Sequence, residues 1–289
     1  MTKENAPNPL LNSVDRPDPI ERIGPIRGWQ AARLAELWQY REILYFLTWR
    51  DIKVRYKQTV IGVAWAIIQP LFMGLVLALF FGRLARLPSD GVPYVLFEYA
   101  GLLPWQLFSH AATESSNSLV LNERLITKVY FPRLLVPLST VLAGVVDFVF
   151  AFVVFIALML FYKAAIPWRI LVVPLFLGIV LLTALAVGLW LSALNVRYRD
   201  VRYTLAFLVQ FWMFATPVAY SAQLVPEKWR VPYGLNPMVG AVEGFRWALL
   251  GTGTLSWPML ATSMLIVFLL LIGGLYYFRR MEASFSDVI

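Results

Sequence analysis

The sequence has no cysteine, only one histidine, and few charged residues, which make up 15% of its 289 positions. Without cysteine there is no disulfide framework, no thiolate nucleophile and no cysteine metal site, and one histidine forms no histidine cluster. None of the 17 glycines is followed by lysine, so the chain has no GxxxxGK[ST] loop to hold nucleotide phosphates. It also has no HExxH or GxSxG stretch. These absences argue against an enzyme, and any ATP that drives the protein must be bound by another subunit.

What the sequence has in abundance is apolar residues. They make up 60% of the chain and give a mean hydropathy of +0.67, whereas soluble domains are nearer half apolar and a quarter charged. This composition excludes a disordered chain, a nucleic-acid-binding domain and an ordinary soluble enzyme, and it predicts a polytopic membrane protein. The net charge of +8 then fits basic residues in cytoplasmic loops that face anionic lipid.

The N-terminal part of the chain changes character near residue 31. Residues 1–30 are polar and rich in proline, with no apolar run of signal-peptide type, so we expect a flexible cytoplasmic tail. In residues 31–58, apolar side chains such as Leu37 and Leu47 alternate with charged ones such as Arg41. This spacing predicts an amphipathic interface helix that ends in a basic elbow. The alternative, a surface helix on a soluble domain, is weaker because no soluble core follows.

Six apolar runs follow, and each is near or above the roughly 20 helical residues that cross a bilayer. They cover residues 60–82, 94–119, 134–162, 168–194, 203–220 and 257–278. We therefore expect an all-α fold with six transmembrane helices over 59–280 and a cytoplasmic tail at 281–289. The segment 221–256 is too long for a turn and too broken for a span. It predicts short external re-entrant helices that surrounding protein shields.

Polar residues within two of the spans need partners. The second span carries Glu98, His110 and Glu114, which are costly in lipid, so this helix should face protein or a water-filled path. Asp147 is the only acid near the middle of the third span. Alone it would cost roughly 2.5–3.5 kcal/mol on insertion, so it should pair inward or contact water. His110 on its own is more typical of a hydrogen-bonded structural residue than of a proton relay.

Basic residues predict the orientation of the spans. One set of flanks is rich in lysine and arginine: Arg41, Arg50, Lys53, Arg55, Lys57, Arg124, Lys128, Arg133, Arg197, Arg199, Arg202, Arg279 and Arg280. The opposite set has fewer: Arg83, Arg86, Lys163, Arg169, Lys228, Arg230 and Arg246. By the positive-inside rule, both termini are predicted to be cytoplasmic.

Three features carry information about function. The basic and aromatic run 49–57 lies before the first span and suits a phosphorylated head group, or else simple positive-inside anchoring. The loop 118–133 has an apolar stripe beside charges, which predicts a docking surface for a partner, or a helix folded on the bilayer. Aromatic residues make up 15% of the chain. Those inside spans either pack or line a path that stacks against sugar rings.

Several blocks together resemble one family. They are RDIKVRYKQTVIGVAWAIIQP (50–70), GLLPWQLF (101–108), NERLITKVYFPR (122–133), NVRYRDVRY (195–203), TPVAYS (216–221), LNPM (235–238) and EGFRWALLG (243–251). In their order and spacing they are similar to the permease subunits of ABC-2 type polysaccharide exporters, over residues 30–280. The blocks look closer to O-antigen and teichoic-acid permeases than to capsule permeases.

The resemblance implies a homodimer that binds two copies of a cytoplasmic ABC ATPase, which in turn binds ATP and Mg²⁺; this chain itself would need no cofactor and no metal. Such a complex exports a lipid-linked polysaccharide such as O-antigen, typically linked to undecaprenyl diphosphate, across the cell inner membrane. Teichoic acid or capsule is the alternative cargo. Besides its second copy and the ATPase, the implied partners are the glycan and membrane lipids, with no nucleic acid.

The resemblance also assigns roles to residues of this sequence. Coupling to the ATPase is implied for Asn122, Glu123, Arg124, Leu125, Ile126, Lys128, Arg197, Arg199 and Asp200. A lipid head-group and gate region is implied for Arg50, Lys53, Arg55, Tyr56 and Lys57. The aromatic residues that we expect to line a glycan channel are Trp65, Phe72, Trp105, Phe108, Trp212 and Phe214.

Two other classes of protein remain as alternatives. A secondary transporter or channel should show inverted repeats, and we find no convincing repeat between 60–162 and 168–278. A membrane-embedded glycosyl- or acyltransferase would need clustered acids or histidine at one membrane face. Asp90, Glu227 and Glu243 are too scattered in the sequence to supply such a cluster.

Overall fold

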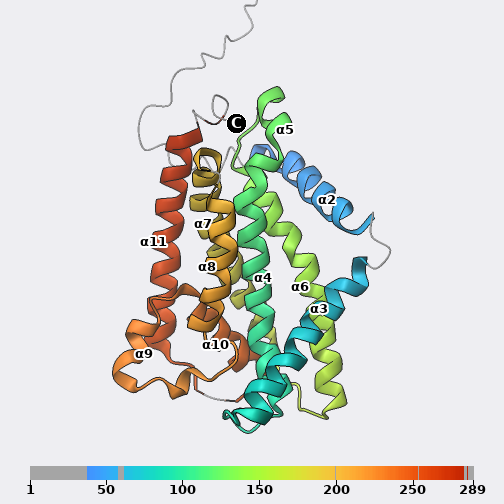
Figure 1. The fold of residues 1–289 in the computed structure, drawn as a ribbon, viewed down its shortest axis with the longest axis vertical. Coiled ribbons are helices and arrows are strands. Elements are labelled where there is room, and N and C mark those ends of the chain that lie inside the picture. The colour runs from blue at the N-terminus through green and yellow to red at the C-terminus, as the bar shows by residue number, and fades with distance from the viewer. Residues whose placement is uncertain (1–37, 58–61, 199, 253, 283–284, 286–289) are drawn as a thin grey trace, which may run out of the picture. The chain divides into compact units, whose positions relative to one another are not determined.

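The computed structural model describes residues 38–57, 62–198, 200–252, 254–282 and 285 (Figure 1). The chain divides into two units, residues 1–31 and 32–289, and all described residues belong to the second unit. The predicted tail at 1–30 and the first part of the predicted interface helix lie outside the described residues. So do all but three residues of the predicted tail at 281–289.

Every regular element among the described residues is a helix, which confirms the all-α fold class. The elements are α2 (Arg41–Lys57), α3 (Gly62–Leu77), the π-helix η2 (Ala78–Leu84), α4 (Tyr94–Leu121), α5 (Glu123–Lys128), α6 (Leu135–Phe161), η3 (Trp168–Val172), α7 (Val173–Arg197), α8 (Val201–Ala215), η4 (Ala222–Leu224), α9 (Glu227–Tyr233), α10 (Pro237–Leu250) and α11 (Trp257–Glu282).

Four helical stretches of the described chain are long and apolar enough to cross a membrane: Ile67–Leu84, Leu135–Phe161, Trp168–Arg197 and Trp257–Glu282. The helix α4 has 28 residues, about 42 Å at 1.5 Å per residue, but its polar residues lower its hydropathy. The helix α8 is apolar but has only 15 residues. The count of six spans therefore stays a prediction that depends on α4 and α8.

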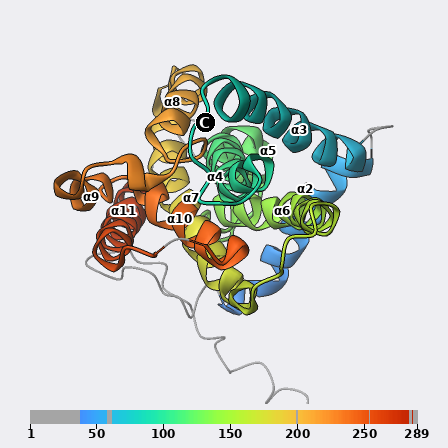
Figure 2. The same cartoon turned by 90° about the horizontal axis from the view of Figure 1, so that it is seen from below.

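The helix α4 lies at the centre of the bundle, where it packs against α3, α6, α7, α8 and α10 (Figure 2). Large apolar side chains such as Phe97, Leu102 and Phe108 are fully buried. They belong to the main apolar core, which α6, α7 and α10 complete. This central position explains how a helix with many polar residues is accommodated, because most of its surface contacts protein.

A second apolar cluster lies where α5, the end of α11 and the beginning of α6 meet (Figure 1). We call it the α5-end cluster. Its buried residues are Leu47, Leu119, Ile126, Phe131, Leu134, Leu135, Val136, Leu189, Ala193, Phe278 and Phe285. The cluster joins residues of six helices, from α2 to α11, so α5 is held by the bundle although it is only six residues long.

The opposite end of the bundle is closed by α10, in the segment predicted to form short re-entrant helices. The Asn236 side chain accepts a hydrogen bond from the Met238 N–H at 3.1 Å, and Pro237 starts the helix, as expected at a helix N-terminus. Gly251 ends it with a left-handed φ of 67°. Because α10 packs against α4, α7 and α11, protein shields its backbone.

The described part of the predicted interface helix, α2, does not divide into one apolar and one polar face. An amphipathic helix has one apolar face, but α2 has apolar side chains on two sides. Leu47 is buried in the α5-end cluster, whereas Tyr45, Phe46 and Trp49 are exposed. The reason is that one side of α2 packs on the bundle, through α6, and this leaves a second, aromatic side uncovered.

Candidate functional site

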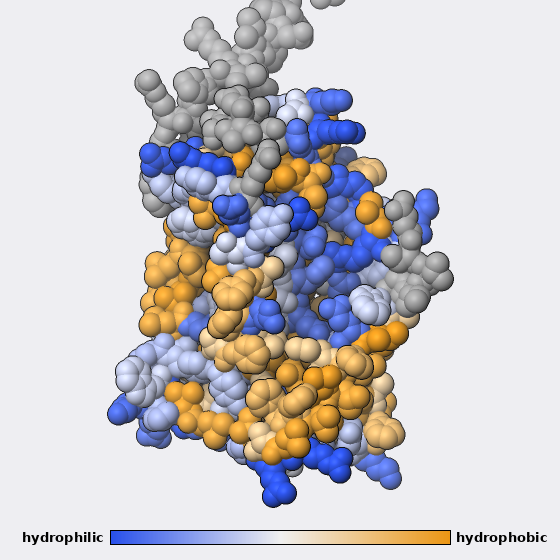
Figure 3. All heavy atoms as spheres, in the orientation of Figure 1, coloured by the Kyte–Doolittle hydropathy of each residue, from blue (hydrophilic) through white to orange (hydrophobic). Residues whose placement is uncertain are grey.

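A stripe of polar side chains follows one face of α4. Its members are half-buried and recur at helical spacing: Gln106, Ser109, His110, Thr113, Glu114 and Asn117. We call them the α4 stripe. Three of them donate to backbone carbonyls of α4 itself: Ser109 Oγ to Gln106 at 3.1 Å, Thr113 Oγ1 to Ser109 at 2.7 Å, and Asn117 Nδ2 to Thr113 at 3.0 Å. Figure 3 shows hydrophilic surface between α2 and α3, where these helices leave α4 and α6 uncovered.

Asp147 on α6 faces this polar region and gathers partners from two other helices. Its carboxylate forms an ion pair with Arg55 and accepts a hydrogen bond from the Tyr56 hydroxyl. His110 Nε2 of the α4 stripe lies 3.7 Å from Asp147 Oδ2. The prediction that Asp147 pairs inward is therefore confirmed. Burial, together with this hydrogen bond, raises the pKa of the Tyr56 phenol.

The basic run at the end of α2 divides into paired and exposed residues. Arg55 and Tyr56 contact Asp147, and Arg50 forms an ion pair with Asp51 at 2.8 Å. Lys53 and Lys57 are exposed. The head-group role predicted for all five residues stays a prediction, and these contacts leave the two lysines as the cations best placed to meet a ligand.

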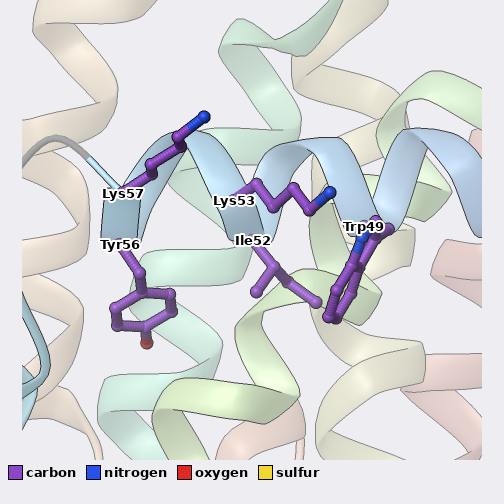
Figure 4. A pocket seen from close by; sticks show the side chains of 5 residues that line it. All are labelled: Trp49, Ile52, Lys53, Tyr56 and Lys57. Atoms are coloured by element: carbon purple, nitrogen blue, oxygen red, sulfur yellow. The ribbon is translucent and has the colours of Figure 1, made fainter.

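The two lysines line an open groove of about 430 Å³ with Trp49, Ile52 and Tyr56 (Figure 4). The Lys53 ammonium lies 5.4 Å from the centre of the Trp49 ring, within the range of a cation–π contact. Cations beside aromatic faces form a chemically suitable surface for a sugar that carries a phosphate, because the rings stack on C–H groups while the cations attract the anion.

The helix α5 has one buried side chain, Ile126. Four of the residues predicted to couple to the ATPase, Glu123, Arg124, Leu125 and Lys128, also lie on α5, and all of them except the half-buried Leu125 are exposed. Asn122 is the residue between α4 and α5. Immediately after α5, Tyr130 is 85% exposed, so its ring is available for contact with a partner.

The second predicted coupling loop lies at the same end of the bundle as α5, between α7 and α8 (Figure 1). Arg197 and Asp200 are exposed, and the Arg197 guanidinium lies 5.5 Å from the centre of the Tyr198 ring. Arg199 lies outside the described residues. The two loops thus present charged and aromatic side chains on one end, and their coupling role stays a prediction.

The six aromatic residues predicted to line a channel do not share one surface. Trp105 and Phe108 are buried, and Phe108 packs edge-on against Trp212 with ring centres 5.0 Å apart. Trp65, Phe72 and Phe214 are exposed on α3 and α8. Trp105 and Phe108 lie on the face of α4 that packs in the apolar core, and the channel role of all six residues stays a prediction.

Sequence reasoning missed the role of Arg246, which it treated only as a basic flank. The Arg246 side chain is almost fully buried and donates to the carbonyls of Phe97, Val218 and Tyr220. It also pairs with Glu243 at 3.0 Å. The bonds to Val218 and Tyr220 satisfy irregular backbone after α8 that has no helical partner, and the bond to Phe97 ties this backbone to the first turn of α4. The sequence offered one indication of this role, since Arg246 lies within the block EGFRWALLG that carries the family resemblance.

Comparison with known proteins adds to this geometry. The family described as ABC-2 type transporter matches residues 42–250. An O-antigen export system permease protein, RfbA, of Klebsiella pneumoniae is 29% identical over 252 residues, which cover 86% of this chain and 95% of the relative. The RfbA of Myxococcus xanthus is 31% identical over 73% of this chain and 81% of the relative. The polysialic acid transport protein KpsM of Escherichia coli is 23% identical over 70% of this chain and 78% of the relative.

Proposed function

The chain belongs to the ABC-2 type transporter family, and we propose that it is the membrane-spanning permease subunit of a polysaccharide exporter. The cargo is a lipid-linked glycan of the O-antigen kind, carried on a polyprenyl diphosphate, and ATP hydrolysis in a separate subunit drives its export. The names of the relatives support polysaccharide export. Teichoic acid or capsule is the second candidate, since one of these relatives transports polysialic acid.

The α4 stripe is the observation that carries this proposal. It lies beside α3 and α8, whose outer sides are apolar: Phe72 and Leu75 on α3 and Phe207 and Phe211 on α8 are each at least 60% exposed. Polar groups facing hydrocarbon are unfavourable by several kcal/mol, so the α4 stripe needs a cover that is not lipid. A polar glycan path meets that need.

A second copy of the chain supplies the other wall of this path. Leu205 is the single buried residue of α8 within the chain, and most of the other residues of α8 are exposed, so one broad side of α8 is available for contact. If α3 and α8 pair with the same helices of a second copy, the α4 stripes of the two copies face each other across a shared polar channel. A homodimer with a two-fold axis is the commonest way to build such a closed path.

The ATPase that drives transport binds at the α5 end of the bundle. We propose that α5 and the loop between α7 and α8 dock on the ATPase, with one ATPase for each copy of the permease. Exposed Glu123, Arg124 and Lys128 offer charge complementarity, and Tyr130 offers an apolar contact. The ATPase, and not this chain, would bind ATP and Mg²⁺, and the permease would have no enzymatic activity of its own.

The groove on α2 is the proposed entry for the cargo. The exposed cations of Lys53 and Lys57 attract the diphosphate, and Trp49 stacks on the first sugar. In this scheme the α5 end faces the cytoplasm, both termini are cytoplasmic, and the protein resides in the cell inner membrane. The excess of basic residues on this side supports the orientation.

The test of this function uses the α4 stripe itself. The permease is reconstituted with its ATPase in vesicles that contain an undecaprenyl-diphosphate-linked O-antigen, and ATP-dependent translocation is measured. The double variant Ser109→Leu/Thr113→Leu fills the path with apolar bulk, so we expect translocation to fall by roughly tenfold or more while ATPase binding persists. Unchanged translocation would exclude the α4 stripe as the path, and translocation of capsule or teichoic-acid precursor instead would reassign the cargo.

The dimer has its own test, because the natural chain is free of cysteine. A single cysteine at Phe211 on α8 should form a disulfide-linked dimer in the membrane on mild oxidation. A single cysteine at Leu175, which is 62% exposed on α7, is the matched control and should not. Equal cross-linking at both positions would indicate random collision and would contradict the proposed interface.

A further inference from the structure

The C-terminal end of α11 and the residues around α5 are joined by contacts that no sequence motif predicts. Four residues make them: Phe278, Arg279 and Glu282 on α11, and Phe285 beyond its end. We call these four residues the α11 clamp. They contact the loop that follows α5 and the cluster on which α5 rests, although they stand about 150 positions later in the chain.

The polar half of the α11 clamp is Glu282, whose two carboxylate oxygens point to different partners. Oε1 accepts from the backbone N–H of Arg133 at 3.1 Å, and Oε2 pairs with Arg279 Nη1 at 2.9 Å. In return, the Arg133 guanidinium donates to the backbone carbonyl of Glu282. The segment between α5 and α6 is thereby fixed to α11 at both backbone and side chain. Charge-assisted bonds of this kind are stronger than neutral ones.

The apolar half of the α11 clamp lies in the α5-end cluster. Phe278 and Phe285 are fully buried and pack edge-on, with ring centres 5.3 Å apart. Ile126, the buried side chain of α5, belongs to the same cluster, as does Phe131 just after α5. The inner side of α5 therefore rests on a surface to which the α11 clamp contributes two large rings.

From the α11 clamp, hydrogen bonds continue toward the α4 stripe. Trp190 Nε1 on α7 donates to the Leu270 carbonyl on α11 at 3.0 Å. Further along α7, Asn195 Nδ2 donates to the Ser116 carbonyl at 3.1 Å and to Asn117 Oδ1 at 3.0 Å. Asn117 is a member of the α4 stripe. A contiguous set of packed helices thus joins α5 to the proposed path through α11 and α7.

We propose that the α11 clamp is a positioning element of α5 and that Glu282 is its key residue. It holds α5 in the orientation needed for docking and passes the displacement of α5 to α11, α7 and the α4 stripe. This inference rests on the proposed docking of the ATPase on α5. Spatial continuity alone does not establish such a coupling, so the tests measure the positioning and the coupling separately.

The positioning test needs neither ATPase nor glycan. A nitroxide label is attached at Thr127→Cys, an exposed site on α5, in the naturally cysteine-free chain, and its mobility is measured by electron paramagnetic resonance. In the Glu282→Ala background we expect the label to tumble about twofold faster, because the loop after α5 loses its anchor. Glu282→Gln keeps an acceptor for the Arg133 N–H and should give a smaller change.

Two controls accompany this test. A label at Lys228→Cys on α9 should not respond to Glu282→Ala. The variant Glu227→Ala, whose carboxylate is 90% exposed on the same helix, should not alter the label at position 127. Identical spectra for wild type and Glu282→Ala at position 127 would overturn the inference, whatever the cargo or the ATPase.

The coupling test measures glycan translocated per ATP hydrolysed in the reconstituted complex. For Glu282→Ala we expect this ratio to fall by about fivefold while the ATPase remains bound. A merely structural defect would lower the yield of folded complex without changing the ratio, and an unchanged ratio would refute the coupling role. If ATPase recovery instead survives mutation of α5 itself, the proposed docking site is wrong, while the mobility result still decides whether the α11 clamp positions α5.

Discussion

The two ends of the helical bundle are built on different principles. At one end, all residues of α10 except Glu243 and Trp247 are buried, and Arg246 bonds three backbone carbonyls of neighbouring segments. At the other end, Ile126 is the single buried residue of α5. Fixed bonds and full burial rigidify the α10 end, whereas α5 presents most of its surface to solvent or to a partner.

Because of this difference, we expect mutations at the two ends to affect different properties of the protein. A group that is buried and fully bonded contributes to the stability of the fold, since its loss leaves partners unsatisfied. Exposed side chains contribute little to stability but decide which partner binds. We therefore expect stability to depend on the α10 end and coupling to depend on the α5 end. Four variants test this contrast, from the largest expected change in stability to the smallest.

Arg246→Leu should have the largest effect on stability. It removes the donors of three carbonyls and leaves the Glu243 carboxylate without its cation, which should destabilise the protein by about 3–5 kcal/mol. The measurement is the midpoint of thermal unfolding in detergent. Arg230→Leu on α9, where the arginine side chain is 34% exposed, is the control. If both variants unfolded at the same temperature, the claim that the bonds of Arg246 make the α10 end rigid would be contradicted.

Gly101→Ala should destabilise by a smaller amount. A Cβ at Gly101 would lie 2.7 Å from Arg246 Nη2 and 2.9 Å from the Val218 carbonyl oxygen, and such overpacking typically costs about 1–3 kcal/mol. Gly178→Ala on α7 is matched in chemistry, but its Cβ would meet no atom within 4 Å. The thermal midpoint should fall for the first variant only. If the midpoint fell equally for both variants, the loss of stability would come from replacing a helical glycine as such and not from a clash with Arg246.

Asp147→Asn lies between the two ends and should have an intermediate effect. It removes the charge that pairs with Arg55, and because both side chains are about a quarter exposed, the stability change should be only about 1 kcal/mol. The functional change should be larger, since the end of α2 loses its attachment to α6 and the groove beside Trp49 shifts. Translocation and the thermal midpoint are compared with those of Glu227→Gln, an acid on α9 whose side chain is 90% exposed. Wild-type translocation by Asp147→Asn would show that this attachment is dispensable.

The triple variant Glu123→Ala/Arg124→Ala/Leu125→Ala should have the smallest effect on stability, within about 0.5 kcal/mol. Its effect on partner binding should nevertheless be the largest, because it removes the exposed and half-buried face of α5 while leaving Ile126 in place. The measurement is recovery of the co-expressed ATPase with the solubilised permease, with Glu227→Ala as control. Full recovery by the triple variant would move the docking site away from α5.

The sequence alone was sufficient for the class of protein and for the order of its segments. Apolar runs and broken, proline-rich stretches are local properties, so they located α6, α7 and α11 to within a few residues. The coupling residues that the resemblance implied around 122–128 lie on and beside α5, and the broken segment 221–256 contains α10. The resemblance of ordered blocks also identified the family, because motif order survives where individual residues change.

Only the tertiary structure decided which side chains meet. Arg55 and Asp147 are 92 positions apart, Arg133 and Glu282 are 149 apart, and no local pattern links either pair. The burial of Trp105 and Phe108, and the second apolar side of α2, depend on which neighbours cover each face. Hydropathy reports whether a segment leaves water, whereas pairing and burial depend on how the helices pack around α4, and that packing is a property of the whole bundle.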